Sequence, residues 1–338
     1  MKSVKFGIVG CGHAAVYHAE AIRALPFLQL TSVCDPDPLV LDQFMRRYSV
    51  KGCSNYEKML EDKALDVVII CTPSGTHANM GMMAANAGKH VLVEKPMALT
   101  LEDADKMMEA CERNKIILSV VMQNRYKPPF QLLKTAVDKG HFGKLSHASI
   151  TVRLNRDENY YRKSSWRGKK AEDGGVIMNQ AIHSIDLLQW FLGPVESVFS
   201  YNATRYRPIE SEDLGVAVLR FSNGALGVIE AASTIYVSNL EHSIGVFGEK
   251  GSVVIGGVKS ETVQTWQFFD IQHEKAAAVA LAKNTGPTGH QGILMDIADA
   301  VKKGSHPVVD GREGRKSLEI VLGTYRSAET GLPVSLPL

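Results

Sequence analysis

The stretch Gly7-Ile8-Val9-Gly10-Cys11-Gly12-His13-Ala14-Ala15 decides the fold of the first part of the chain. It ends an apolar run and contains Gly10-x-Gly12-x-x-Ala15, the dinucleotide fingerprint with alanine in its last place. In such a turn the first glycine permits a tight bend, the second lets the backbone approach a pyrophosphate, and the alanine keeps helix and strand close. The helix N-terminus that follows presents free N–H groups to the anion. The stretch therefore predicts a strand, turn and helix that bind a dinucleotide, with His13 and Ala14 at the turn.

An acidic residue ends the second apolar run, roughly 20 residues beyond this turn, where the fingerprint requires one. The carboxylate of Asp35 can accept both ribose hydroxyls of NAD and would repel the 2′-phosphate of NADP. The segment Asp35-Pro36-Asp37-Pro38 offers no lysine or arginine for that phosphate. We therefore expect NAD as the cofactor. The alternative is that Asp35 is an ordinary surface carboxylate.

Short apolar runs alternate with segments of helical length throughout residues 1–123. The runs lack polar alternation, as expected for strands that are buried on both faces of a parallel sheet. This alternation predicts an α/β fold, with a doubly wound parallel sheet of the Rossmann type. One helix is expected to begin at Thr100, with Asp103 three residues on as in a capping box. The expected strands are Lys5–Val9, Leu28–Cys34, Asp66–Cys71, His90–Val93 and Ile116–Met122.

The pattern changes after about Pro128, so residues 124–338 are expected to form a second α/β domain. From Val195 to about Phe269, strands follow one another with turn residues between them, which predicts a large, open, mostly antiparallel sheet. Two closing helices either complete this domain or pack back on the first one. The expected elements are the helix Pro129–Lys139, the strand Lys144–Leu154, and helices around Asn179–Leu192, Gln291–Lys303 and Gly311–Thr330.

Length and composition limit the classes of function. The 338 residues suit two domains, and a net charge of +2 gives no reason to expect nucleic acid or a membrane surface as partner. The five cysteines lack paired spacing, so we expect reduced thiols and no metal site. No apolar run approaches the roughly 20 residues of a membrane span, and we expect that the short apolar run at the start does not act as a signal peptide. We expect a cytoplasmic enzyme.

Two further strings give the chain a family resemblance. Cys71-Thr72-Pro73-Ser74-Gly75-Thr76-His77 and Gly88-Lys89-His90-Val91-Leu92-Val93-Glu94-Lys95-Pro96, together with the glycine fingerprint, resemble the Gfo/Idh/MocA family of sugar oxidoreductases. The resemblance runs along essentially the whole chain. It implies a Rossmann domain, a second domain with a large open sheet, NAD(P) chemistry on a sugar hydroxyl, and a homodimer or homotetramer built on that sheet.

A narrower resemblance comes from four strings in the second domain: Gln123–Pro129, Arg153–Arg156, Trp166–Gly168 and Gly174–His183. These are similar to the subgroup that oxidises UDP-N-acetylglucosaminuronate at C3, a step in making sugars for surface polysaccharide. Most of the wider family carries aspartate where this chain has Asn179, whereas the subgroup carries asparagine. The resemblance therefore implies a nucleotide-linked sugar acid as the substrate.

The resemblance also implies the site residues. Lys95 and His183 are the expected catalytic groups, with Asn179 beside them, because positions i and i+4 share one helix face and Asp186 lies on roughly the same face. A neutral imidazole suits a base near pH 7. The cofactor set is Gly10, Gly12, His13, Ala14, Ala15, Asp35, Thr72, Pro73, Ser74, His77, Glu94, Lys95, Gln123, Trp166 and Arg167. The substrate set is Arg125, Arg153, Asn155, Arg156, Asn179 and Gln180.

The charge pattern gives an independent reason for an anionic substrate. Residues 153–170 carry seven basic side chains against two acidic ones, with Tyr160, Tyr161 and Trp166 between them. A pyrophosphate and a carboxylate would bind several arginines or lysines, and an aromatic ring could stack on uracil. The alternative is a solvated basic loop, in which the two tyrosines pack beneath the chain and Arg167 serves the cofactor.

Two other functions fit the same sequence. One is a dehydrogenase of a free polyol or simple sugar, which would need no such concentration of basic residues. The other is a non-catalytic NAD-binding regulator on the same fold, against which the presence of both Lys95 and His183 speaks.

Overall fold

A computed structural model describes residues 3–258, 260–269 and 286–338. The chain forms two compact units, one of residues 1–123 with 287–315 and the other of residues 124–286 with 316–338. The first stretch ends at residue 123 as expected, and residues 287–315 pack back on the first unit, which is one of the two alternatives for the closing segment. Hydrogen bonds explain why this segment belongs to the first unit. Val309 lies beside residues 119–120, and its O accepts from Val120 N at 3.1 Å and from Ser119 Oγ at 2.9 Å.

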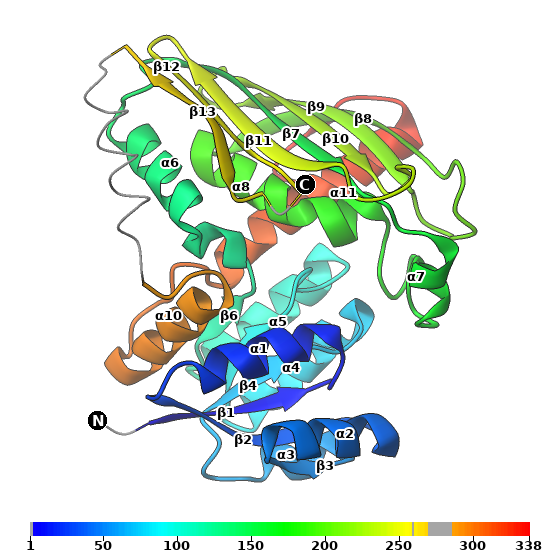
Figure 1. Cartoon of the computed structure of the whole chain (residues 1–338), viewed down its shortest axis with the longest axis vertical. Helices are drawn as coiled ribbons and strands as arrows, with labels where there is room; N and C mark the ends of the chain where they lie inside the picture. The colour runs from blue at the N-terminus through cyan, green and yellow to red at the C-terminus, as the bar shows by residue number, and fades with distance from the viewer. Residues whose placement is uncertain (1–2, 259, 270–285) are drawn as a thin grey trace. The chain divides into compact units, whose positions relative to one another are not determined.

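The first unit contains the predicted Rossmann sheet (Figure 1). Its six strands run parallel in the order β3-β2-β1-β4-β5-β6, the order of a dinucleotide-binding fold. The strands are β1 Val4–Val9, β2 Leu28–Cys34, β3 Lys51–Cys53, β4 Val67–Ile70, β5 His90–Val93 and β6 Leu118–Val120. The helices are α1 His13–Arg23, α2 Pro38–Tyr48, α3 Tyr56–Leu60, α4 His77–Asn86, α5 Leu101–Arg113 and α10 His290–Lys303.

Local sequence explains these elements. All four residues of β4 are fully buried, which is why its sequence Val-Val-Ile-Ile shows no polar alternation. Thr100 caps α5 as expected, with its Oγ1 accepting from Asp103 N at 3.1 Å. The sequence pattern did not indicate β3, because three residues at the edge of a sheet give too short an apolar run.

The second unit is built on an eight-stranded sheet of order β13-β12-β11-β7-β10-β9-β8-β14. It is mostly antiparallel as predicted, although its central pair β7 and β10 is parallel. The strands are β7 Leu145–Arg153, β8 Val195–Ala203, β9 Leu214–Phe221, β10 Leu226–Ala232, β11 Glu241–Gly248, β12 Gly251–Gly256, β13 Thr262–Phe268 and β14 Val334–Ser335. The helices are α6 Pro128–Asp138, α7 Glu158–Arg162, α8 Ile182–Leu192 and α11 Gly311–Thr330, and α11 begins within the first unit.

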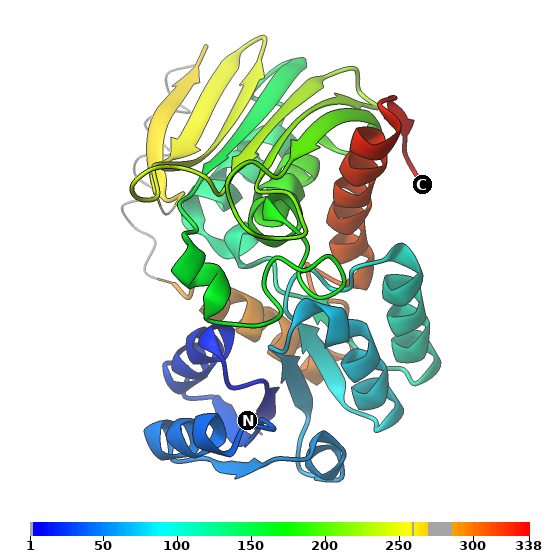
Figure 2. The same cartoon turned by 90° about the vertical axis from the view of Figure 1, so that its right-hand side faces the viewer.

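The two faces of this sheet differ. The helices α6, α8 and α11 lie on one side of the sheet (Figures 1 and 2). Alternate residues of β7, namely Ala148, Ile150 and Val152, are buried. Ser200 of β8 ties α11 to that face, donating from its N to Ser327 Oγ and from its Oγ to Thr324 O. Helices thus cover one face and close the core.

The opposite face carries apolar side chains that are open to solvent. On neighbouring strands β8, β9 and β10, five of them are between 41% and 70% exposed: Tyr201, Val216, Val218, Leu226 and Val228. Their alternation with buried residues along each strand shows that they share this face. We call these five residues the open-face patch.

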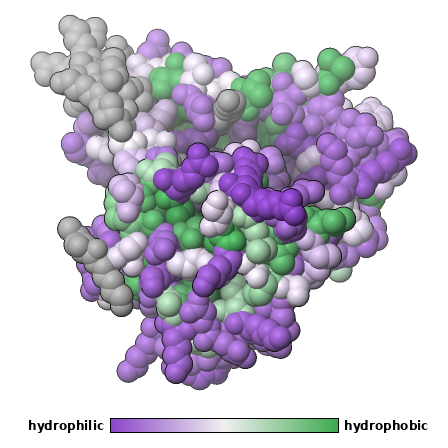
Figure 3. Space-filling view, turned by 60° about the horizontal axis from the view of Figure 1, so that its bottom comes forward, coloured by the Kyte–Doolittle hydropathy of each residue, from purple (hydrophilic) through white to green (hydrophobic). Residues whose placement is uncertain are grey.

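Figure 3 shows one side of the molecule with polar residues over most of it and apolar residues gathered in a limited area. Among the described residues, no helix is both long and apolar enough to cross a membrane.

Candidate functional site

The glycine turn after β1 has the geometry that its sequence predicts. Gly10 has a φ of +85°, and a Cβ there would lie 2.7 Å from Cys71 O, so only glycine fits. A Cβ on Gly12 would meet nothing within 4 Å, which leaves open space above the turn. Ala15 is fully buried between helix and strand. The turn can therefore hold a pyrophosphate against the N-terminus of α1.

Asp35 lies at the end of β2 and is tied to this turn. Its Oδ2 accepts from Cys11 N at 2.8 Å and its Oδ1 from Asp37 N at 2.9 Å. Each oxygen retains acceptor capacity, because a carboxylate offers about four lone-pair sites. The turn and the carboxylate are thus fixed relative to each other, as one binding element for a ribose and a pyrophosphate requires.

Lys95 follows β5 at the same carboxyl edge of the sheet, which is where such sheets bind ligands. The preceding residue, Glu94, is buried and forms a 2.8 Å ion pair with His18 Nε2. Its second oxygen accepts from Lys95 N at 3.2 Å. Burial alone would raise the pKa of Glu94, but the hydrogen bond and charge of His18 lower it to about 2. The charged carboxylate therefore holds the backbone that carries Lys95.

His77 joins two of the predicted cofactor segments. Its Nδ1 lies 2.8 Å from Pro96 O and its Nε2 lies 2.8 Å from Thr72 O. Both partners are carbonyl oxygens, so a neutral ring can donate to only one of them. Burial lowers the pKa of His77, which favours that neutral ring. The buried ring therefore lies between the two segments and donates to one of the two carbonyl oxygens. The surface beside it is formed by the partly exposed Thr72 and Pro73.

One group in the described residues has the composition of a metal site. The ligand atoms of His18, Cys71 and Glu94 lie within 4.8 Å of one another. The His18 nitrogen already engages Glu94, and burial raises the pKa of the Cys71 thiol well above its usual value, which disfavours the thiolate that binds metals. We therefore interpret these residues as the support of Lys95.

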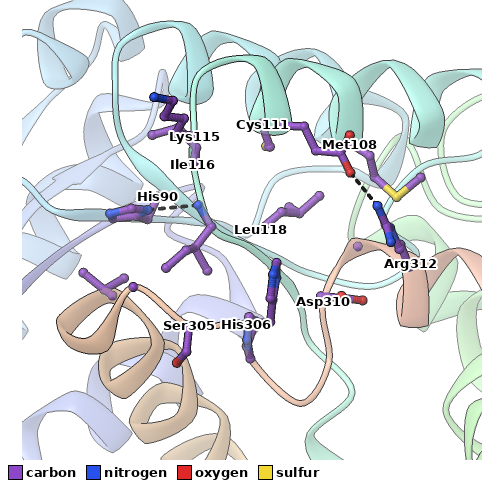
Figure 4. A pocket seen from close by; sticks show the side chains of 16 residues that line it. His90, Met108, Cys111, Lys115, Ile116, Leu118, Ser305, His306, Asp310 and Arg312 are labelled. Atoms are coloured by element: carbon purple, nitrogen blue, oxygen red, sulfur yellow. Dashed lines mark hydrogen bonds and ion pairs between the residues drawn. The ribbon is translucent and has the colours of Figure 1, made fainter.

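A separate hollow of about 580 Å³ lies in the first unit (Figure 4). His90 and Leu118 in its wall begin β5 and β6, so it lies at the amino edge of the sheet, opposite the glycine turn. Its walls mix apolar side chains with acidic and basic ones, and Arg312 and Glu112 at its rim form an ion pair. It is no part of the cofactor site.

In the second unit, a buried acid fixes the start of the helix that bears His183. Glu212 Oε1 accepts from Ile177 N at 2.9 Å and from Tyr325 Oη at 3.0 Å. A Cβ on Gly175 would lie 2.1 Å from that carboxyl group, so the glycine is required for this approach. Burial raises the pKa of Glu212 to about 7. Sequence reasoning missed this residue, since it lies distant along the chain from the helix that it supports.

A π-helical turn, Ile177–Ala181, precedes α8 and contains Asn179 and Gln180. Such turns are frequent at functional sites. Asn179 Nδ2 donates to Asp173 Oδ1, and Gln180 Nε2 donates to Asn179 Oδ1. Asn179, Gln180 and His183 are all partly exposed and so can reach a ligand.

Two of the predicted substrate arginines already have acidic partners. Arg125 is 2% exposed and forms a two-pronged ion pair with Asp186 of α8 at 2.6 and 2.8 Å. Arg153 contacts Glu230 at 2.7 Å and Glu241 at 2.9 Å. The expectation that Arg125 binds substrate directly needs correction, because burial removes its guanidinium from solvent. Arg153 is held by two carboxylates and is a weak candidate for the same reason.

The apparent concentration of positive charge is partly neutralised in the same way. Arg162 pairs with Glu158, and Lys169 with Glu172. The two strongest remaining candidates, Arg156 and Arg167, both lie against the ring of Tyr160, at 5.1 and 4.2 Å from its centre. The Nε of each is buried and has no hydrogen-bond partner within the described part of the chain, so any ligand would have to meet the other guanidinium nitrogens.

Asn155 has a supporting role. Its Nδ2 donates to Val237 O at 2.7 Å, and its N donates to Asn239 Oδ1, which also accepts from Arg156. It therefore secures the loop after β10 beside Arg156. Trp166 lies beside Arg167, whose guanidinium is 5.3 Å from the indole ring. Gln123 ends the first unit, and its buried Oε1 is without a partner among the described residues.

Comparisons with known proteins identify the family. Residues 4–122 match the oxidoreductase family with an NAD-binding Rossmann fold, and residues 130–254 match the GFO/IDH/MocA C-terminal domain. A relative, the myo-inositol 2-dehydrogenase of Thermotoga maritima, is 28% identical over 98% of both chains.

Two solved structures are similar over the whole chain. The WlbA dehydrogenase from Bordetella pertussis, in complex with NADH and UDP-GlcNAcA, is 38% identical, with a TM-score of 0.93 and 100% of both chains covered. The WlbA dehydrogenase from Chromobacterium violaceum, with the same two ligands, is 39% identical, with a TM-score of 0.94 over 100% of this chain and 97% of that one. The glycine turn, the carboxylate that orients Lys95 and these similarities agree: the chain belongs to the Gfo/Idh/MocA family and is an NAD-dependent oxidoreductase.

Proposed function

We propose that the protein oxidises the C3 hydroxyl of a nucleotide-linked sugar acid, UDP-N-acetylglucosaminuronate. The observation that carries the proposal is the full-length similarity to two dehydrogenases solved with NADH and UDP-GlcNAcA, at 38% and 39% identity. The sugar dehydrogenase relatives with inositol substrates are less similar, at 27% and 28% identity. The named substrate is consistent with Arg156 and Arg167, two cationic side chains that lie together over the ring of Tyr160.

The chemistry requires a base for the hydroxyl proton and a positive charge beside the developing alkoxide. In our proposal the neutral imidazole of His183 accepts the proton, and the ammonium of Lys95 stabilises the oxygen. Asn179 orients the sugar, since an amide cannot take the proton near neutral pH. NAD, when bound, supplies the hydride acceptor. Glu94 contributes by holding the backbone of Lys95.

The substrate's anionic groups would be held by Arg156 and Arg167. Both guanidinium groups lie over Tyr160, so the pair is held in place by the ring as well as by hydrogen bonds. Arg167 donates from Nη1 to Tyr160 O at 2.9 Å, which leaves other donors for a phosphate or carboxylate.

The second candidate function is oxidation of a free polyol, which the inositol dehydrogenases among the relatives favour. A free polyol carries no charge, so it would leave the placing of two guanidinium groups, those of Arg156 and Arg167, over the one ring of Tyr160 unexplained. The non-catalytic regulator is disfavoured because the family membership and the supported Lys95 both indicate an enzyme.

Substrate preference is the direct test. NADH production should be higher by orders of magnitude with UDP-N-acetylglucosaminuronate than with UDP-N-acetylglucosamine or myo-inositol. Arg156→Ala should reduce kcat/KM for the uronate by about 10-fold to 100-fold, because a charge-assisted hydrogen bond is lost. Arg162→Ala, whose guanidinium is exposed and paired with Glu158, is the matched control and should change little. Equal or better activity with myo-inositol would refute the substrate.

Coenzyme preference follows from Asp35. The wild-type enzyme should use NAD with a higher kcat/KM than NADP, because the carboxylate repels a 2′-phosphate. Steady-state rates with the two coenzymes at fixed sugar concentration measure this. Comparable or better kcat/KM with NADP would show that Asp35 does not face the adenosine ribose.

The catalytic roles predict different losses. Lys95→Ala should lower kcat by about 10²–10³-fold while NAD still binds, because the stabilising charge is lost. His183→Ala should cost about 10²–10⁴-fold, and Asn179→Ala should cost less. Lys115→Ala, an exposed lysine at the opposite edge of the sheet, is the control. An Asn179 variant that is more damaged than the His183 variant would reverse the assignment of the base.

We also propose that the open-face patch is covered by a second copy of the chain, as a homodimer or homotetramer. Contiguous exposed apolar side chains on a sheet face are typical of an interface. Light scattering at micromolar concentration should give at least twice the 36.9 kDa of one chain. Val218→Glu, in the middle of the patch, should lower that mass, whereas Leu39→Glu on the first unit should not. A monomeric wild-type protein would contradict the proposal.

A further inference from the structure

Four side chains in the second unit form one hydrogen-bond chain. Arg156 Nη2 donates to Gln180 Oε1 at 2.9 Å. Gln180 Nε2 then donates to Asn179 Oδ1, and Asn179 Nδ2 donates to Asp173 Oδ1. The chain starts at a cation and ends at an anion, and each amide accepts on the side of Arg156 and donates on the side of Asp173.

The direction of this chain is set by its ends. A guanidinium can only donate, and an ionised carboxylate can only accept. Between them an amide can connect both neighbours in one orientation only, with its oxygen toward the guanidinium. Each bond also polarises the next, so the chain is stronger than separate pairs would be. Gln180 and Asn179 are therefore held in defined orientations before any substrate arrives.

Asp173 is the buried end of the chain. It is 2% exposed, and its other oxygen accepts from Gly168 N at 2.9 Å. The carboxylate thus accepts from two different donors, one on each oxygen. A single amide oxygen in its place could not serve both with the same geometry, because the amide nitrogen would face one of the N–H groups.

We propose that Asp173 is a positioning residue that orients Asn179 and, through Gln180, Arg156 toward the substrate. The inference rests on the proposed function, in which Asn179 and Arg156 contact the sugar acid. It also explains the residue type at position 179. A carboxylate there would face the carboxylate of Asp173, without a hydrogen to donate and at close range.

The test is a double-mutant cycle with Asp173→Asn, Asn179→Asp and the double variant. In the double variant the pair is reversed. The amide introduced at position 173 could accept from Gly168 N and donate to the carboxylate introduced at position 179, which could still accept from Gln180. We expect Asn179→Asp to lower kcat/KM for the uronate by about 10-fold to 100-fold in the wild-type background, and by much less in the Asp173→Asn background.

The single Asp173→Asn variant separates positioning from folding. It should raise KM for the sugar acid more than it lowers kcat, because Asn179 and Arg156 are the groups proposed to contact the sugar acid. Glu172→Gln removes the neighbouring charge and is the matched control, since Glu172 pairs with Lys169 rather than with Asn179. The melting temperatures of the wild type, the two single variants and the double variant, measured without substrate, give a second double-mutant cycle that reports on stability alone.

The outcomes are distinct. Additive melting temperatures would overturn the Asp173–Asn179 interaction, whatever the substrate. Coupled melting temperatures with unchanged sugar KM in Asp173→Asn would overturn its positioning role. If the wild-type enzyme neither binds nor oxidises the UDP sugar acid, the proposed function fails, while the melting cycle still decides whether Asp173 holds Asn179. Rescue of both stability and sugar KM in the double variant would support the inference.

Discussion

The close approach of Gly10 to the backbone of Cys71 is the constraint on which the cofactor half of the site depends. Gly10 has a φ of +85°, and a Cβ at this position would lie 2.7 Å from Cys71 O. The turn after β1 therefore lies directly against the end of β4. The segment that starts at Thr72 is thereby placed at the same edge as the turn. His77 then connects Thr72 to Pro96, next to Lys95. One glycine thus brings the ends of three strands into a single binding surface.

The buried carboxylate of Glu94 holds the backbone of Lys95, whose own charged side chain is partly exposed. The ion pair of Glu94 with His18 lies beneath the segment, and Glu94 also accepts from the Lys95 backbone. Ion pairs in the interior contribute little net stability, because desolvation opposes their attraction. Their value here is geometric, since an ionised Glu94 fixes the backbone while Lys95 stays partly exposed. Breaking the pair would leave an uncompensated buried charge next to Lys95.

Much of the fold could be predicted from sequence, because it depends on local patterns. Apolar runs without alternation indicated the parallel strands, and Thr100 with Asp103 indicated the start of α5. What could not be predicted depends on contacts between distant positions. The acids that pair with Arg153 come from β10 and β11, and Glu212, which supports the start of the His183 helix, comes from the loop before β9. A count of charges within residues 153–170 therefore overstates the charge that is open to a ligand.

The substrate half shows why residue lists from sequence need the structure to assign roles. Arg125 belongs to a string with family resemblance, yet its buried pair with Asp186 makes it an anchor of α8 rather than a ligand. Because Asp186 and His183 lie on the same helix, this anchor limits how far the imidazole can move. Arg156 differs in that its chain of partners passes through the partly exposed Gln180 and Asn179 before it ends at Asp173. Burial and hydrogen-bond direction, which a motif does not encode, thus separate arginines that hold the site from those that can meet a ligand.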